Sequence, residues 1–227
     1  MANAKFESGA RILLRKNKNC AQLFVYFRGA RLHRSFDGPL WLLRETKALN
    51  RNSIIINDPY DAYYQLGVGQ EPANFDELMI RVERLVNSLD WVRDIYIVGR
   101  STGAFAALEC GMRLDATAIY CFAPDATAAD EMEFEDIETA NKVASAMNSA
   151  DLKPQLMEHR CGEIKIFYSE GHAADAAKAA SLSDVPRLSL VPMPGERHDP
   201  LSTIRVHSLA EGLFPAFVAA EPTPGAV

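Results

Sequence analysis

Short apolar runs alternate with amphipathic stretches along most of the chain. Each run is bounded by polar or turn-forming residues, as the strands of a buried parallel sheet are. Several of the stretches between them repeat apolar residues at helical spacing. This alternation predicts successive strand–helix–strand units, and therefore an α/β fold whose mostly parallel central sheet has helices on both faces.

Strands are expected over residues 10–15, 21–27, 53–57, 94–98, 116–122, 163–168 and 187–191. The first two are separated only by the polar residues 16–19. We therefore expect them to form a hairpin whose second strand enters the sheet.

Helices are expected over residues 74–89, after residue 103 up to about residue 113, over 173–180 and from about 201 to 214. The first of them begins with Asn74 as N-cap and Glu77 three residues later, the pattern of a capping box. Its apolar residues repeat on one face, which we expect to be buried: Leu78, Met79, Val82, Leu85, Val86 and Leu89.

The length of 227 residues suits one α/β domain with a sizeable core, expected over residues 1–220 with a loose tail over 221–227. Apolar residues make up 48% of the chain and charged residues 24%, which argues against disorder. The net charge of −6 argues against nucleic acid or an anionic membrane as partner.

The four cysteines are scattered without a C-x-x-C pair, so neither a metal site nor a disulfide framework is expected, and no cofactor is expected. The N-terminal residues lack the apolar stretch of a signal peptide, and no run is long enough to span a bilayer. We therefore expect a cytoplasmic protein.

Residues 125–162 are polar and include a dense acidic cluster over 130–138. Such a charge pattern is typical of a solvated helical face. The alternative is a small lid, because the segment leaves the predicted sheet beside the strand that carries the motif described next.

The pentapeptide Gly99-Arg100-Ser101-Thr102-Gly103 lies between a predicted strand and a segment of small residues. This order predicts a strand, a sharp turn and a helix, which is the context of a G-x-S-x-G nucleophile elbow. A serine hydroxyl needs a histidine to take its proton and a carboxylate to orient that histidine. Ser101 is therefore the candidate nucleophile.

His198 follows the last predicted strand and is the candidate base, whereas His207 and His159 are expected to lie on the surface or to pack. Three carboxylates could orient His198: Glu170 and Asp175 follow the strand 163–168, and Asp125 closes the preceding strand. We favour Asp175, which is far enough beyond its strand to turn back toward the histidine. The alternative role for Asp175 is a charge that stabilises the N-terminus of the helix 173–180.

An oxyanion hole needs two backbone N–H groups aimed at the developing charge. Thr102 is expected to supply one, and Ala30, in the turn that Gly29 begins after the strand 21–27, the other. Gly29 could equally serve only to let the chain leave the strand.

Together these motifs resemble the α/β-hydrolase superfamily over residues 21–217. Compact bacterial members are the most similar, through an F-x-G loop, a D-x-x-x-x-Y segment and an F-x-P stretch, here Phe27-Arg28-Gly29, Asp58 to Tyr63 and Phe122-Ala123-Pro124. The resemblance implies an α/β-hydrolase fold with a small or minimal lid. Its motif order is specific for the fold and not for a substrate.

Five residues are expected to contact the substrate: Arg100, Gly29, His33, Tyr60 and Tyr63. Arg100 could anchor an anionic group or form a salt bridge, and Thr102 stands where a bulky or apolar residue is frequent in the superfamily. The two tyrosines could line a pocket or pack their loop onto the domain.

We therefore expect a serine hydrolase of the esterase or thioesterase type, in which a carboxylic ester or thioester acylates Ser101. The acyl substrate is expected to be a small molecule or carrier-bound. Two alternatives stay open: a noncatalytic accessory protein with the same fold, and an acyltransferase or cyclase that uses the same nucleophile.

Overall fold

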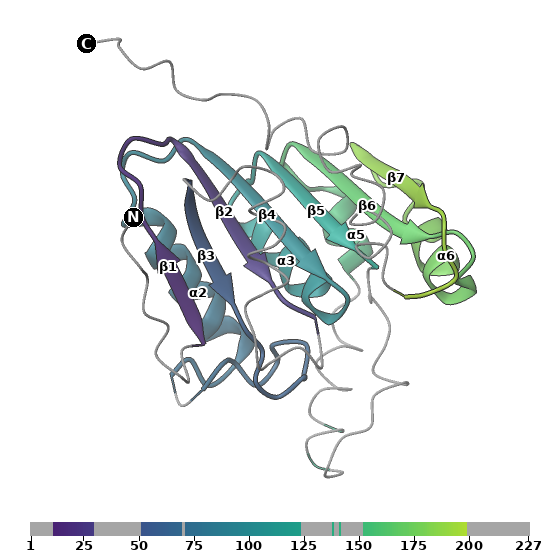
Figure 1. The fold of residues 1–227 in the computed structure, drawn as a ribbon, viewed down its shortest axis with the longest axis horizontal. Helices are drawn as coiled ribbons and strands as arrows, with labels where there is room; N and C mark the ends of the chain where they lie inside the picture. The colour runs from purple at the N-terminus through teal and green to yellow at the C-terminus, as the bar shows by residue number, and fades with distance from the viewer. Residues whose placement is uncertain are drawn as a thin grey trace.

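The computed structural model describes residues 11–29, 51–69, 71–123, 138, 141 and 152–198. These residues form a seven-stranded sheet in the order β1-β3-β2-β4-β5-β6-β7, with helices packed against it (Figure 1). The strands β2 to β7 are parallel to their neighbours, and β1 is antiparallel to β3. The prediction of an α/β fold with a mostly parallel sheet is confirmed.

The strands are β1 (Ile12–Arg15), β2 (Gln22–Phe27), β3 (Asn52–Ile56), β4 (Asp94–Arg100), β5 (Ala118–Phe122), β6 (Glu163–Ser169) and β7 (Leu188–Met193). The helices are α2 (Phe75–Asn87), α3 (Thr102–Arg113), α5 (Leu152–Met157) and α6 (Ala173–Ala180). Helix α6 has the predicted bounds. Strand β4 continues through Gly99 and Arg100, so the motif begins inside the strand.

The predicted hairpin of the first two strands is wrong, because β3 lies between β1 and β2. All five residues of β3 are buried, so this strand needs a neighbour on each side. Its first residue, Asn52, is fully buried and donates its amide N–H groups to the carbonyls of Cys20 (2.7 Å) and Gln22 (2.9 Å). Its side-chain oxygen accepts from the N–H of Asn17 at 2.7 Å. These bonds hold the connection between β1 and β2 beside the start of β3.

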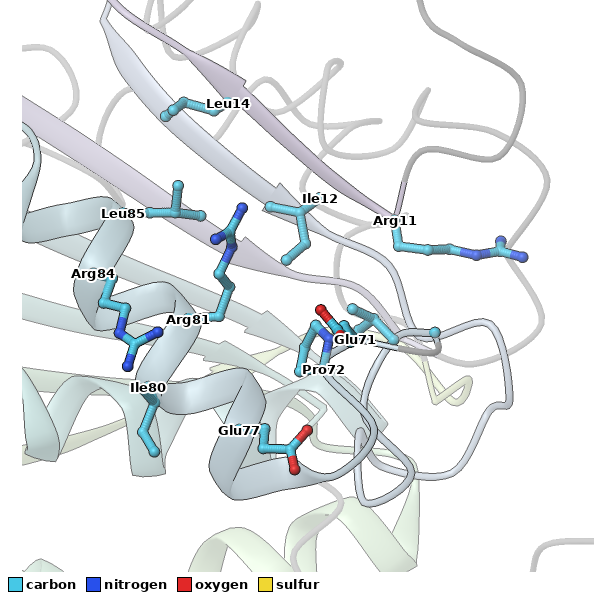
Figure 2. Close-up of a pocket in the computed structure, with 12 residues that line it drawn as sticks. Arg11, Ile12, Leu14, Glu71, Pro72, Glu77, Ile80, Arg81, Arg84 and Leu85 are labelled. Carbon is cyan, nitrogen blue, oxygen red and sulfur yellow. The ribbon is translucent and has the colours of Figure 1, made fainter.

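A hollow of about 970 Å³ lies between the edge strand β1 and helix α2. Arg81 and Leu85 project from α2 toward Ile12 of β1 (Figure 2). Arg11, Arg84, Glu71 and Glu77 also line the hollow, so its wall mixes basic, acidic and apolar groups.

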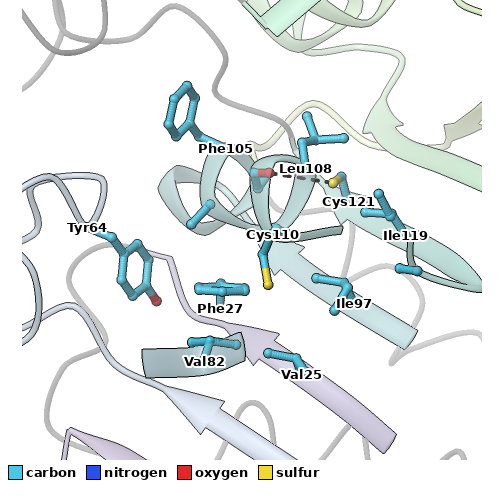
Figure 3. Packing of buried hydrophobic residues seen from close by; sticks show 14 of the residues in the cluster. Val25, Phe27, Tyr64, Val82, Ile97, Phe105, Leu108, Cys110, Ile119 and Cys121 are labelled. Atoms are coloured by element: carbon cyan, nitrogen blue, oxygen red, sulfur yellow. Dashed lines mark hydrogen bonds between the residues drawn. The ribbon is translucent and has the colours of Figure 1, made fainter. Parts of the chain in front are cut away.

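The core lies between the sheet and the helices α2 and α3 (Figure 3). Tyr64 packs edge-on against Phe27 of β2, with ring centroids 5.4 Å apart. The rings of Phe75 in α2 and Phe105 in α3 pack together with their centroids 5.8 Å apart, so the two helices lie side by side. This packing supports α3, the helix that follows Ser101.

The N-cap of α2 at Asn74 is confirmed, but the return bond from Glu77 goes to the residue before the cap and not to the cap itself. The side-chain oxygen of Asn74 accepts from the N–H of Glu77, and the Glu77 carboxylate accepts from the N–H of Ala73, both at 2.9 Å. Leu78, Met79, Val82, Val86 and Leu89 of the predicted apolar face are buried, and Leu85 is half-buried.

Several predictions fall on residues that the structure does not describe. The helix from 201 to 214 and the tail 221–227 lie outside the described residues, as does the acidic cluster except Glu138. Of the segment 125–162, residues 138, 141 and 152–162 are described. Among the described helices, none combines the length and apolarity needed to cross a membrane.

Candidate active site

Ser101 occupies a sharp turn between β4 and α3, with φ 50° and ψ −125°. A positive φ is costly for a residue that carries a side chain, so the surrounding packing must hold it. A Cβ on Gly99 would lie 2.5 Å from the Ala107 Cβ, and one on Gly103 would lie 2.4 Å from the Arg28 carbonyl oxygen. Helix α3 therefore approaches β4 and the end of β2 closely only because both motif glycines lack side chains. This is the geometry predicted for the elbow.

The structure brings together the three side chains predicted as nucleophile, base and acid. Ser101 Oγ lies 2.8 Å from His198 Nε2, and His198 Nδ1 lies 2.8 Å from Asp175 Oδ1. Asp175 is fully buried, whereas the side chain of His198 is 40% exposed. The arrangement can carry a proton from the hydroxyl to the imidazole while the carboxylate holds the ring.

Two backbone hydrogen bonds join the loops that carry Asp175 and His198. The N–H of Glu170, after β6, donates to the carbonyl of Met193 at 3.0 Å, and the N–H of Gly171 donates to the carbonyl of Gly195 at 2.9 Å. A Cβ on Gly171 would lie 2.6 Å from the Gly195 oxygen. The two loops therefore continue the pairing of β6 with β7 beyond the strands.

Of the three candidate acids, Asp175 is the one in contact with His198 among the described residues. It lies in the first turn of α6 and not in the loop before it. Asp175 therefore has both positions considered for it, at the N-terminus of the helix and in contact with His198. Glu170 is exposed, and Asp125 lies outside the described residues.

The predicted oxyanion region is described in part. Thr102 is the first residue of α3, where backbone N–H groups have no intrahelical acceptor. Gly29 borders the nucleophile, because a Cβ there would lie 2.9 Å from the Arg100 carbonyl oxygen and 3.1 Å from Ser101 Cβ. Ala30 and His33 lie outside the described residues.

Buried polar contacts fix the chain just before Gly29. Arg28 is 2% exposed and donates to the side-chain oxygen of Asn57 at 2.9 Å. Tyr64 donates its hydroxyl to the carbonyl of Arg28, also at 2.9 Å. The loop after β2 is thus anchored to the loop after β3.

Asp58 organises the loop after β3. Its carboxylate accepts from the N–H groups of Tyr60, Ala62 and Tyr64 at 2.8 to 3.0 Å. Burial raises the pKa of Asp58 to about 6, although these three bonds favour the charged form. The first residue of the D-x-x-x-x-Y segment therefore has a structural task.

The other residues expected at the substrate have different surroundings. Arg100 is half-buried at the end of β4. Tyr60 is 47% exposed, whereas Tyr63 is fully buried in the core. A fully buried ring has no surface to offer a ligand, so packing of the loop is the better interpretation of Tyr63. The hollow beside α2 is lined by none of the predicted site residues.

Sequence reasoning missed His172, which lies beside Asp175. It is the N-cap residue of α6, and its Nδ1 lies 3.1 Å from Asp175 Oδ1. The available signal was its position just before the alanine-rich helix, three residues ahead of Asp175, where no Ser, Thr, Asn or Asp stands as N-cap.

Comparisons with known proteins bear on the fold. No protein-family model and no curated protein sequence matches the chain. Est1E from Butyrivibrio proteoclasticus has a similar structure, with 14% identity, a TM-score of 0.65 and coverage of 92% of this chain and 93% of that one. MenH from S. aureus is similar too, with 14% identity, a TM-score of 0.62 and coverage of 92% and 99%.

The capsule O-acetyltransferase of Neisseria meningitidis serogroup A also matches, with 14% identity, a TM-score of 0.65 and coverage of 93% of this chain and 92% of that one. At such identities a structural likeness concerns the fold and not the activity. The sheet order, the elbow and these three likenesses all indicate the same fold. This chain has the fold of the α/β-hydrolase superfamily.

Proposed function

We propose that the protein is a serine hydrolase that cleaves a carboxylic ester or thioester through an acyl-enzyme on Ser101. The observation that carries the proposal is the continuous chain of contacts from Ser101 Oγ through His198 to Asp175, with both distances at 2.8 Å. A nucleophile, a base and a group that orients the base, all within hydrogen-bond reach, are what acyl transfer to a serine requires.

In the proposed reaction, Ser101 Oγ attacks the acyl carbon and its proton passes to His198 Nε2. Asp175 accepts the Nδ1–H of His198, which selects the ring tautomer with a free Nε2 and stabilises the imidazolium. His198 then returns the proton to the departing alcohol or thiol. A water molecule repeats the sequence on the acyl-enzyme and releases the carboxylic acid, while the free Ser101 hydroxyl is restored.

The oxyanion of the tetrahedral intermediate would be bound by the N–H of Thr102 and by that of Ala30. Two features support this assignment: Thr102 opens α3, and Gly29 runs so close to Ser101 that a Cβ on it would lie 3.1 Å from Ser101 Cβ. Removing one such donor costs about 2.7–4 kcal/mol of transition-state stabilisation in other hydrolases.

Acyl transfer to an acceptor other than water is the second candidate. The likeness to the capsule O-acetyltransferase has the same TM-score, 0.65, as the likeness to Est1E. Both reactions share the acyl-enzyme, so they differ only in the group that attacks it. A noncatalytic role would be favoured by separation of His198 from Ser101, and the distance of 2.8 Å weighs against it.

A fluorophosphonate probe tests the nucleophile directly. We expect labelling of the folded wild type at Ser101, no labelling of Ser101→Ala, and full labelling of Ser88→Ala, a matched change at an exposed serine. Ser101→Ala should also abolish hydrolysis of p-nitrophenyl and thioester substrates. Well-folded wild type that stays unlabelled would refute the proposal, and product analysis with an added alcohol separates hydrolysis from transfer.

A further inference from the structure

The carboxylate of Asp175 has two imidazoles on one oxygen. His198 Nδ1 lies 2.8 Å from Oδ1, and His172 Nδ1 lies 3.1 Å from the same atom. The hydrolytic chemistry proposed above uses only His198. His172 therefore adds a second nitrogen ligand at a place where the reaction needs none.

The three groups come from the start of α6 and from the segment after β7, and the two imidazoles are accessible. His172 is the N-cap of α6 and His198 follows β7, and their rings are tilted by 54° with centroids 5.6 Å apart. The histidine side chains are 33% and 40% exposed, so an ion can reach them from solvent. One ligand atom from each of the three residues lies within 4.8 Å of the others.

The buried carboxylate also has an unused oxygen. Asp175 is fully buried, and within the described part of the chain its Oδ2 has no hydrogen-bond partner. A buried oxygen without a partner costs free energy, and a cation held by both carboxylate oxygens, Oδ1 and Oδ2, would remove that cost. The unpartnered Oδ2 is a second feature of the site beside the spacing of the two imidazoles.

We propose that His172, Asp175 and His198 form a binding site for a divalent transition-metal ion, best represented by Zn²⁺. Two imidazoles and a carboxylate suit zinc and its neighbours in the first transition row, whereas Mg²⁺ and Ca²⁺ prefer oxygen ligands. At bond lengths of about 2.1 Å, the ligand atoms of a tetrahedral ion lie about 3.4 Å apart. Each present contact to Oδ1 therefore has to open by only a few tenths of an ångström, and water completes the coordination.

The ion would switch off the hydrolytic site, a consequence that rests on the proposed function. A metal on His198 Nδ1 takes the lone pair there, so the neutral ring carries its proton on Nε2. A protonated Nε2 cannot accept the proton of Ser101. Zinc binding and general-base catalysis are then mutually exclusive, and the inhibition is reversed by a chelator.

Binding is tested without reference to activity. Chelator-treated full-length protein is dialysed against ZnCl₂ and then CoCl₂, with bound metal and the visible absorption of Co²⁺ as readouts. The test variant is His172→Asn, because asparagine is a good N-cap and preserves the start of α6. The matched control is His159→Gln, which removes an imidazole that contacts the thiol of Cys161, a second soft pair at 2.9 Å.

We expect one ion per wild-type chain, an affinity at least about tenfold weaker in His172→Asn, and an affinity within about twofold of wild type in His159→Gln. Absence of a stoichiometric ion in the wild type would overturn the proposal. So would wild-type affinity in a folded His172→Asn protein, or loss of the ion in His159→Gln instead.

The activity arm measures each variant against its own metal-free rate. Zinc should inhibit ester hydrolysis by the wild type, and the half-inhibitory concentration should rise at least about tenfold in His172→Asn. Stoichiometric binding without any hydrolysis would leave the metal site standing and refute the proposed function. Hydrolysis that zinc does not inhibit, by protein that binds no ion, would support the proposed function and refute the metal site.

Discussion

Replacing Gly103 with alanine tests why the motif ends in glycine. The added Cβ would lie 2.4 Å from the carbonyl oxygen of Arg28 and 2.5 Å from that of Phe27. Both oxygens belong to the backbone at the end of β2, so neither can rotate away and the helix or the strand must shift. Overpacking of this kind costs about 1–3 kcal/mol, and the rigid neighbours favour the upper end. Alanine regains up to about 1 kcal/mol of helix propensity, which leaves a net loss of about 2 kcal/mol.

Thermal unfolding followed by circular dichroism measures the effect. For a chain of this size, a loss of about 2 kcal/mol lowers Tm by about 4–8 °C. The control is Gly69→Ala, whose Cβ would have no heavy atom within 4 Å. We expect Gly69→Ala to unfold within about 2 °C of the wild type, because the added methyl group overlaps with nothing. A wild-type Tm in Gly103→Ala, or an equal fall in Gly69→Ala, would refute the reasoning.

Three further predictions concern the acid, a buried carboxyl and a helix cap. Asp175→Asn no longer selects the imidazole tautomer, so kcat should fall by roughly 10³–10⁴-fold. The exposed Asp184→Asn is its control, and equal kinetics in the two variants would contradict the role. Burial raises the pKa of Asp58 from 3.8 to about 6, so from about pH 4 to 6 the folded chain binds more protons than the unfolded chain. In urea unfolding, wild-type stability should therefore fall with rising pH relative to Asp58→Asn, by about 3 kcal/mol, and a gap constant in pH would argue against the shift. Asn74→Ala should lower the free energy of unfolding by about 1 kcal/mol and Asn74→Gly by a few tenths, whereas equal losses would speak against the cap.

Most of the secondary structure was predictable because it depends on neighbours in sequence. The spacing of apolar residues in α2, its N-cap at Asn74 and the bounds of α6 all follow from local periodicity and local hydrogen bonds. The pairing of β1 was not predictable in this way. Sequence proximity favours a hairpin, but the fully buried β3 takes the place between the first two strands.

The candidate site was predictable as a list of residue types in the right order. Ser101 on its turn and His198 after the last strand were found because a motif and a strand end mark each of them. The preference for Asp175 over Glu170 rested on its distance from the strand end. In the structure the two loops continue the pairing of β6 with β7 through hydrogen bonds, and this directs Asp175 toward His198 while Glu170 is exposed.

The sequence by itself determined the elements and the elbow, because each depends on residues that are close along the chain. It also supplied the order of the candidate nucleophile, acid and base, because a motif or a strand end marks the place of each. Only the tertiary structure decided that Asp175 contacts His198, that Gly29 borders Ser101 and that His172 shares the carboxylate. These contacts join segments far apart in sequence or depend on side-chain direction. They exist only where the sheet register and the loops beyond it bring those segments to one edge.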